Sequence, residues 1–261
     1  MRVDDPVLRI EPIVSPIIGQ GIRAAMAGAR YVAVLTGAGI SAESGLATFR
    51  DAQTGLWARF DPLELATPSA FARNPKLVWD WYAWRREQVA AAEPNDGHRA
   101  LAELERRVPR FLLITQNVDG LHQRAGSRNV VELHGNIGRV KCSREGTIVD
   151  RWEPSGEAVP RCATCGAMLR PDVVWFEEML PADALARAEA AAGECDVLLV
   201  VGTSAEVYPA AALPGYAQQS GATVIEINPN PTLSSAADHS LRGAAGTLLP
   251  ALVASLSSRT P

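Results

Sequence analysis

Short runs of apolar and β-branched residues alternate along this chain with longer amphipathic or alanine-rich stretches. Runs that are apolar at nearly every position are typical of strands buried on both faces of a sheet. Such runs are YVAVLT at 31–36, RFLLIT at 110–115, VVEL at 130–133, DVLLVVG at 196–202 and TVIEIN from residue 223. Helical patterns separate them at 16–28, 97–107, 181–192, 209–220 and 247–256. This order of strands and helices predicts an α/β fold with an open parallel sheet covered on both faces.

Two segments interrupt this alternation. Residues 51–93 are helical in pattern and contain no expected strand, and residues 139–172 are rich in Cys, Gly, Pro and charge. Both are expected to form a smaller inserted module beside the sheet. The sheet domain would then be assembled from 1–50, 94–138 and 173–261.

The first inserted segment contains an unusual aromatic stretch, WDWYAWRRE, from Trp79 to Glu87. Asn74 followed by a proline is a good helix start, so one helix is expected over residues 75 to about 91. On it, Tyr82 and Arg85 are three residues apart and share a face. The residues expected to face the core are Val78, Trp81 and Val89. The stretch is either a core helix with a solvated Arg85 or the wall of a pocket for a charged ligand.

A glycine-containing loop, TGAGISAESG, follows the first expected strand. Gly37 and Gly39 would let the backbone turn tightly and approach a pyrophosphate at a helix N-terminus. The alternative is an ordinary turn from strand to helix. Because no acidic residue closes a second strand about twenty positions later, an ordinary dehydrogenase site is a poor match. A variant dinucleotide site agrees better with the pattern.

Five motifs together give a more specific result. They are TGAGISAESGLATFRD, TQNVDGLH at 115–122, ELHGN at 132–136, VGTSAEVYPAA at 201–211 and EINPNPT at 226–232. In this order and spacing the chain resembles the sirtuins, a family of NAD-dependent protein deacylases. The resemblance implies a Rossmann-like domain with a small domain made of a helical module and a zinc ribbon, matching the two interruptions.

The resemblance also implies which residues bind NAD. The loop residues are Gly37, Ala38, Gly39, Ser41, Phe49 and Arg50. Those around the nicotinamide and its ribose are Gln116, Asn117 and Asp119, the last two positioning the ribose. Those holding the adenosine half are Gly202, Thr203, Ser204, Asn228 and Pro229. Read singly, each of these motifs is better explained as a capped turn, but in combination they are not.

His134 lies between the run VVEL and a glycine, and a lone histidine in such a place is more often structural than catalytic. The resemblance instead implies that it is the general base, which removes a proton from a ribose hydroxyl. The implied products are free lysine, nicotinamide and O-acyl-ADP-ribose. Val174 and Phe176 are implied to contact the acyl-lysine peptide. In this region Glu177 replaces the glycine that is more usual in the family.

The choice of acyl group follows from a finer resemblance. Tyr82-x-x-Arg85, preceded by ATPSAF, is similar to the desuccinylase and demalonylase branch of sirtuins, with Ala66 widening the acyl pocket. A guanidinium and a phenol can together hold a terminal carboxylate. We therefore expect a preference for succinyl-, malonyl- or glutaryl-lysine over acetyl-lysine.

A zinc ribbon is expected to have two C-x-x-C pairs, roughly 15 to 20 residues apart. This chain has Cys142-x-x-Glu145 and then Cys162-x-x-Cys165, so one thiolate is replaced by a carboxylate. Such a site should bind zinc more weakly, and the alternative is a ribbon that folds without metal. Cys195, which precedes a strand, is expected to be a small buried residue rather than a ligand.

Composition restricts the remaining classes. The 261 residues are 47% hydrophobic and 21% charged, with a formal charge of -4, which gives no overall basic field for nucleic acid. No apolar run approaches the ~18 residues of a membrane span, and the start MRVDDPVLRIEP lacks the order of a signal peptide. We expect a cytoplasmic, monomeric enzyme acting on acyl-lysine proteins. The alternatives are an NAD or ADP-ribose sensor with little turnover and a plain deacetylase.

Overall fold

The computed structural model describes residues 18–47, 61–152, 159–233 and 236–256. Its main element is a six-stranded sheet in the order β3-β2-β1-β6-β7-β8, in which every neighbouring pair is parallel. The strands are β1 (Tyr31–Thr36), β2 (Arg110–Thr115), β3 (Val130–Glu132), β6 (Val197–Val201), β7 (Thr223–Asn228) and β8 (His239–Arg242). All five apolar runs are therefore strands. The central strands β1 and β6 are buried at every position, as expected for a sheet covered on both faces.

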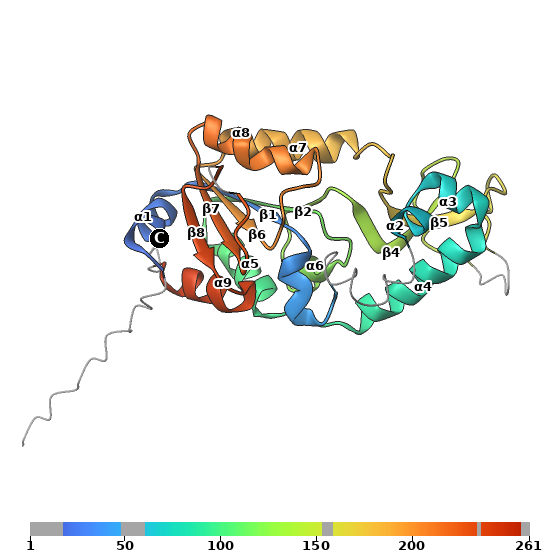
Figure 1. Cartoon of the computed structure of the whole chain (residues 1–261), viewed down its shortest axis with the longest axis horizontal. Helices are drawn as coiled ribbons and strands as arrows, with labels where there is room; N and C mark the ends of the chain where they lie inside the picture. Colours follow the sequence, from blue (N-terminus) through green and yellow to red (C-terminus); the bar gives the residue numbers. More distant parts are fainter. Residues whose placement is uncertain (1–17, 48–60, 153–158, 234–235, 257–261) are drawn as a thin grey trace, which may run out of the picture.

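Helices cover both faces of this sheet (Figure 1). One layer consists of α1 (Gln20–Gly28), α5 (Asp96–Arg107) and α9 (Ala245–Ala254), whose apolar side chains join a core with the sheet. The opposite layer consists of α7 (Ala182–Glu194) and α8 (Leu213–Gln219), which close a second core. The predicted α/β, Rossmann-like fold is confirmed. None of the described helices is both long and apolar enough to cross a membrane.

Strand β8 has no counterpart among the expected strands. Its sequence HSLR contains one apolar residue, Leu241, which is its only buried position. As an edge strand it needs to bury little apolar surface, so it lacks the hydrophobic signal of the central strands. Its parallel pairing with β7 comes from the tertiary fold and not from a local pattern.

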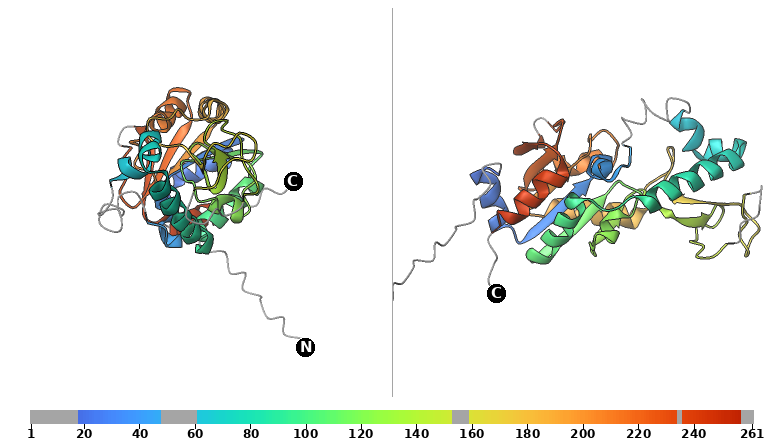
Figure 2. Two further views of the ribbon diagram at one scale, coloured as in Figure 1. Left: turned by 90° about the vertical axis from the view of Figure 1, so that its right-hand side faces the viewer. Right: turned by 90° about the horizontal axis from the view of Figure 1, so that it is seen from below.

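A smaller module lies beside the sheet rather than over either face (Figures 1 and 2). It contains an antiparallel pair, β4 (Gly135–Cys142) and β5 (Leu169–Val173), together with α2 (Pro62–Leu65), α3 (Pro68–Arg73) and α4 (Pro75–Ala91). Its side chains form a third core, separate from the two that flank the large sheet. The two interruptions in the sequence pattern thus supply most of one packing unit.

Helix α4 begins and ends where the sequence predicts. The side chain of Asn74 accepts a hydrogen bond from the backbone N–H of Leu77, and a proline occupies the first helical turn. Val78, Tyr82 and Val89 are buried against the small module's core. Trp81 is half-buried and packs against this core, as expected, and Trp79 on the same helix is also buried in it.

The chain order changes direction at the centre of the large sheet. From β1 it runs outward through β2 and β3 on one side, and β6, β7 and β8 fill the other side. In open α/β sheets, the crevice at the carboxyl ends of the two strands flanking such a switch point is the usual ligand site. Here that crevice lies after Thr36 and Val201, where the glycine loops begin.

Candidate functional site

Two glycine loops cross at close range at the carboxyl ends of β1 and β6. The backbone N–H of Gly39 donates to the carbonyl oxygen of Gly202 at 2.8 Å, and that of Gly37 donates to Val201. A Cβ on Gly37 or Gly39 would lie 2.8 Å from backbone atoms of Gly202, and Gly202 itself has φ of +60°. Side chains are therefore excluded here, and the 3-10 helix η1 (Ala38–Ser44) starts without a side-chain cap. This small-residue cradle fits the pyrophosphate of a dinucleotide.

A buried polar network adjoins the cradle. Ser41 Oγ donates to Asp119 Oδ2 at 2.7 Å and accepts from Asn117 Nδ2 at 3.1 Å. Burial raises the pKa of Asp119, an effect opposed by hydrogen bonds from the Leu121 backbone and from Ser41. The structure thus brings together three predicted residues from two segments and leaves carboxylate and amide atoms available to orient a ligand.

The sequence reasoning missed His98 as a member of this network. His98 Nε2 lies 3.4 Å from Ser41 Oγ, while its Nδ1 accepts the backbone N–H of Asn95. A backbone N–H can only donate, so the proton is on Nε2. Burial, and to a smaller extent Arg99, lowers the pKa of His98 to about 4, so the ring is neutral. The available signal was Asn95 at a helix start with a histidine three residues later, which forms a capping box.

The next set of residues links the nicotinamide side and the adenosine side of the predicted NAD site. Gln116 Nε2 donates to Thr203 Oγ1 at 3.0 Å across 87 residues of sequence. Asn228 Nδ2 donates to the Thr203 carbonyl at 2.9 Å. Ser204 is half-buried and Pro229 is exposed on the same loops. Phe49 and Arg50, also predicted to bind NAD, lie outside the described residues.

His134 lies next to this group, directly before β4. Its Nδ1 is 2.8 Å from the carbonyl oxygen of Gln116, and its own carbonyl accepts the backbone N–H of Val174. A carbonyl oxygen can only accept, so Nδ1 carries the proton and Nε2 has the free lone pair. Burial lowers the pKa of His134 from its ordinary value near 6.5, with the hydrogen bond to Gln116 acting in the opposite direction. The ring is therefore a neutral base at physiological pH.

Tyr82 and Arg85 lie on α4, and Arg85 is close enough to Asp119 to interact with its charge. Arg85 is half-buried and has no hydrogen bond or ion pair with another described residue. Burial lowers its pKa, and the nearby Tyr82 and Asp119 oppose that change. Tyr82 is 4% exposed, and its hydroxyl oxygen accepts the indole N–H of Trp175 at 3.0 Å. The pair is therefore electrostatically coupled, and its cation has no fixed anionic partner among the described side chains.

The segment after β5 passes between His134 and α2. Val174 donates its backbone N–H to the His134 carbonyl, and Phe176 donates to the carbonyl of Ala66. Phe176 is 41% exposed. Glu177 has φ of +71°, in the left-handed region that favours glycine. The resemblance leads us to expect a glycine at this position, and a glycine would adopt this backbone conformation without the strain that a glutamate meets.

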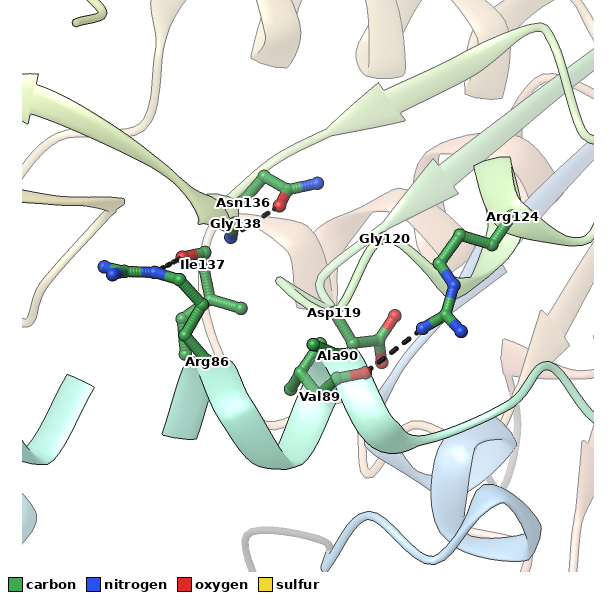
Figure 3. A pocket seen from close by; sticks show the side chains of 9 residues that line it. All are labelled: Arg86, Val89, Ala90, Asp119, Gly120, Arg124, Asn136, Ile137 and Gly138. Carbon is green, nitrogen blue, oxygen red and sulfur yellow. Dashed lines mark hydrogen bonds between the residues drawn. The ribbon is translucent and has the colours of Figure 1, made fainter. Parts of the chain in front are cut away.

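A cavity of about 270 Å³ lies on the other side of Asp119, between α4 and the start of β4. Figure 3 shows the side chains that line it, with Arg86 donating to the Ile137 carbonyl and Arg124 donating to that of Val89. The two guanidiniums hold backbone carbonyls from different elements. They therefore link α4 to β4 and to the short helix α6 (Leu121–Arg124).

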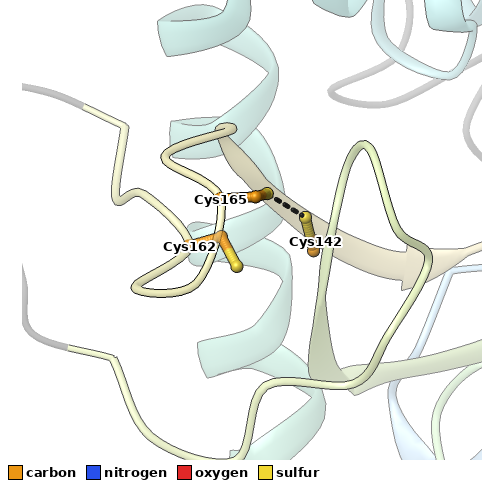
Figure 4. Close-up of side chains that lie close together, drawn as sticks. All are labelled: Cys142, Cys162 and Cys165. Carbon is orange, nitrogen blue, oxygen red and sulfur yellow. Dashed lines mark hydrogen bonds between the residues drawn. The ribbon is translucent and has the colours of Figure 1, made fainter.

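Three cysteines gather at the end of the small module (Figure 4). The Sγ atoms of Cys142, Cys162 and Cys165 all lie within 4.8 Å of one another, as three ligands of a tetrahedral metal site would. Among the described residues, Glu145 is not part of this cluster. Its backbone N–H donates to Cys142 Sγ, and Glu145 is exposed. The fourth predicted ligand is thus close in sequence but outside the cluster. Cys195 is buried in the core between the sheet and α7, as expected.

Comparison with known proteins agrees with this geometry. The model of the Sir2 family matches residues 37–209. A protein of Aquifex aeolicus named NAD-dependent protein deacylase is 58% identical over 204 residues, which cover 77% of this chain and 84% of that protein. NAD-dependent protein deacylase 1 of Pseudomonas aeruginosa is 52% identical over 237 residues, covering 87% and 95%. A solved Sir2 homologue in complex with NAD is 50% identical, with a TM-score of 0.85 over 91% of this chain and 93% of the homologue.

Proposed function

This chain belongs to the Sir2 family, and from that membership we propose that it is an NAD-dependent deacylase of protein lysine side chains. The observation that carries the proposal is the neutral, oriented His134 close to the crossing of the two glycine loops. The names of the relatives support the same reaction class.

We propose that the residues around the cradle bind the co-substrate. Gly37, Gly39 and Gly202 would approach its pyrophosphate, while Asn117 and Asp119 would orient the nicotinamide ribose. Bound NAD supplies an electrophilic ribose carbon and nicotinamide as leaving group. The rest of the cofactor would be lined by the remaining predicted residues that the structure describes, which are Ala38, Ser41, Gln116, Thr203, Ser204, Asn228 and Pro229.

His134 is proposed as the general base. Its Nε2 lone pair would accept a proton from a ribose hydroxyl once the acyl oxygen is bonded to the sugar. The Gln116 carbonyl holds the Nδ1 proton in place, so that the tautomer needed for this transfer is already present. Its role is therefore proton transfer, whereas Asn117 and Asp119 position the sugar.

The acyl group is proposed to be succinyl, malonyl or glutaryl, in preference to acetyl. The half-buried guanidinium of Arg85 has no ionic partner among the described residues, and the phenol of Tyr82 lies close enough to influence its pKa. A terminal carboxylate would accept charge-assisted hydrogen bonds from Arg85 and a further one from Tyr82. Acetyl-lysine lacks that carboxylate and would leave the partly desolvated Arg85 unpaired. Ala66, half-buried beside Phe176, would leave room for the longer group.

Zinc is proposed as a structural ion of the small module. Three thiols in one cluster supply suitable soft ligands, with Glu145 or water completing the site after a small movement of its loop. The ion would contribute stability to β4 and β5 and would take no part in the reaction.

One assay tests both the reaction and the acyl preference. The full chain is incubated with NAD and a matched panel of acetyl-, succinyl-, malonyl- and glutaryl-lysine peptides, and free lysine peptide and O-acyl-ADP-ribose are measured by mass spectrometry. We expect turnover only with NAD, and faster turnover of the anionic acyl groups. NAD binding without turnover would instead support a sensor, and equal rates on all four peptides would support an unselective deacylase.

Variants of Arg85 locate the preference. Arg85→Met is expected to lower kcat/KM for succinyl-lysine ~10- to 100-fold, in line with the loss of a charged hydrogen bond of about 1.5 to 3 kcal/mol. Arg85→Lys keeps the charge but loses the planar guanidinium, so its kcat/KM for succinyl-lysine should lie between those of the wild type and Arg85→Met. Deacetylation should change little in either variant. If both substrates are affected alike, Arg85 does not select the acyl group.

A further inference from the structure

A series of contacts in the small module connects Glu178, through Arg170 and Trp175, to the hydroxyl of Tyr82. Glu178 accepts from Arg170 through both of its oxygens, at 2.6 and 2.8 Å, and also accepts the backbone N–H of Trp175 at 2.8 Å. The guanidinium carbon of Arg170 lies 3.4 Å from the centre of the Trp175 ring. The indole N–H of Trp175 then donates to Tyr82 Oη at 3.0 Å.

The direction of the hydrogen bond between Trp175 and Tyr82 follows from the chemistry of the two groups. An indole N–H can only donate, so the Tyr82 oxygen must be the acceptor, and the phenolic hydrogen must point elsewhere. The described residues offer that hydrogen no acceptor. Burial raises the pKa of Tyr82, so the hydroxyl keeps its proton at physiological pH. Tyr82 is thereby left as a donor within a buried site, near Arg85, which has no ion pair with another described residue.

We infer that Trp175 is a positioning residue for acyl selection, which holds the Tyr82 hydroxyl as a hydrogen-bond donor toward an anionic acyl terminus. This inference rests on the proposed acyl preference and adds to it a residue that does not itself touch the acyl group. Without the indole N–H, the hydroxyl could rotate between donating and accepting, and part of its preorganisation toward a carboxylate would be lost. A carboxylate can only accept, whereas an acetyl methyl group can do neither.

Arg170 and Glu178 support the same arrangement. Arg170 is 7% exposed and Trp175 is 2% exposed, so neither side chain has room to change rotamer freely. The cation over the indole ring attracts the ring electrons and makes its N–H a stronger donor. Glu178 holds both the cation and the Trp175 backbone, so the indole has a single orientation toward Tyr82.

The experiment compares KM and kcat of Trp175→Phe for succinyl- and acetyl-lysine peptides of one sequence, at saturating NAD. Phenylalanine keeps an aromatic ring but removes the N–H. We expect KM for the succinyl peptide to rise ~3- to 10-fold, the range for loss of one neutral hydrogen bond, with the acetyl KM changing less than about twofold. Trp79→Phe is the matched control, because Trp79 is buried in the same core but contacts Trp152 and Arg86 instead of Tyr82.

A double-mutant cycle separates orientation from packing. In a Tyr82→Phe background, Trp175→Phe should have no further effect on the succinyl KM, since no hydroxyl remains to be positioned. A further loss there, or equal losses on both acyl groups, would overturn the inference and leave Trp175 as a packing residue. If Trp175→Phe does not fold, the indole N–H resonance in ¹⁵N-tryptophan-labelled protein replaces it: the Trp175 signal should shift in Tyr82→Phe. An unchanged signal would show that the bond is absent.

The outcomes also separate this inference from the proposed function. A wild-type protein that does not favour succinyl over acetyl overturns both. If the wild type favours succinyl over acetyl and Trp175→Phe keeps the same preference, only the role of Trp175 is overturned.

Discussion

The Nδ1 atom of His134 lies 2.8 Å from the carbonyl oxygen of Gln116, and this contact determines which ring nitrogen is the base. The carbonyl requires a proton on Nδ1, so Nε2 alone can accept one. We therefore expect His134→Ala to retain its fold and its NAD affinity while losing turnover by ~10²-fold or more. Calorimetric titration with NAD and the peptide assay measure the two properties separately. Full activity of the variant would remove His134 from the mechanism.

The pH dependence follows from the same histidine. A general base must be unprotonated, so activity should fall as pH decreases through the pKa of His134. Because burial lowers that pKa below its ordinary value near 6.5, the acidic limb of the kcat/KM profile is expected below pH 6.5. The profile is measured with a succinyl peptide and repeated with an acetyl peptide, whose side chain does not titrate. An acidic limb above pH 7 on both substrates would contradict the assignment.

The crossing of the glycine loops predicts a steric effect on cofactor binding. Gly39→Ala places a Cβ 2.8 Å from the Cα and carbonyl oxygen of Gly202, and neither backbone atom can move without opening the cradle. We expect NAD affinity to fall ~10-fold or more, equivalent to about 1.4 kcal/mol. Gly215→Ala is the control, since a Cβ there meets nothing within 4 Å and the residue lies in helix α8. It should leave NAD binding unchanged and stabilise the protein slightly.

Glu177 predicts a gain in stability. At φ of +71°, a non-glycine residue costs roughly 1 to 2 kcal/mol, of which part is offset because glycine loses more entropy on folding. Glu177→Gly should therefore raise the free energy of unfolding by ~0.5 to 1 kcal/mol in urea denaturation. The same replacement at Glu87, an exposed position within α4, should lower it by about 1 kcal/mol. Destabilisation by Glu177→Gly would mean that its side chain makes a stabilising contact.

The thiol cluster predicts a metal-dependent stability. The purified protein is expected to contain substoichiometric zinc, because three thiols are in place but the fourth ligand is an exposed carboxylate. Glu145→Cys should raise both zinc content and the unfolding temperature, since metal binding adds to folding free energy. Glu145→Gln serves as the control, because it should not raise the zinc content. Metal analysis that finds no zinc in the wild type or in Glu145→Cys would rule out the site.

Residues with a strong local signal were predictable from the sequence alone. The apolar runs determined five of the six strands of the described sheet, most clearly β1 and β6, because a strand buried on both faces must be apolar throughout. Asn74 and its proline likewise determined the start of α4. The motifs around Gly37, Asn117 and His134 indicated the family, since their order along the chain is itself information carried by the sequence.

Contacts between distant segments were decided only by the tertiary structure. Strand β8 has almost no apolar pattern, because an edge strand is held mainly by the backbone of its neighbour. The positions of His98 beside Ser41 and of Trp175 beside Tyr82 depend on packing between segments that are 57 and 93 residues apart. No local propensity encodes such a distance. The sequence determined which side chains are present at each strand end and on α4, and the packing of the two modules decided which atoms of those side chains remain free to bind.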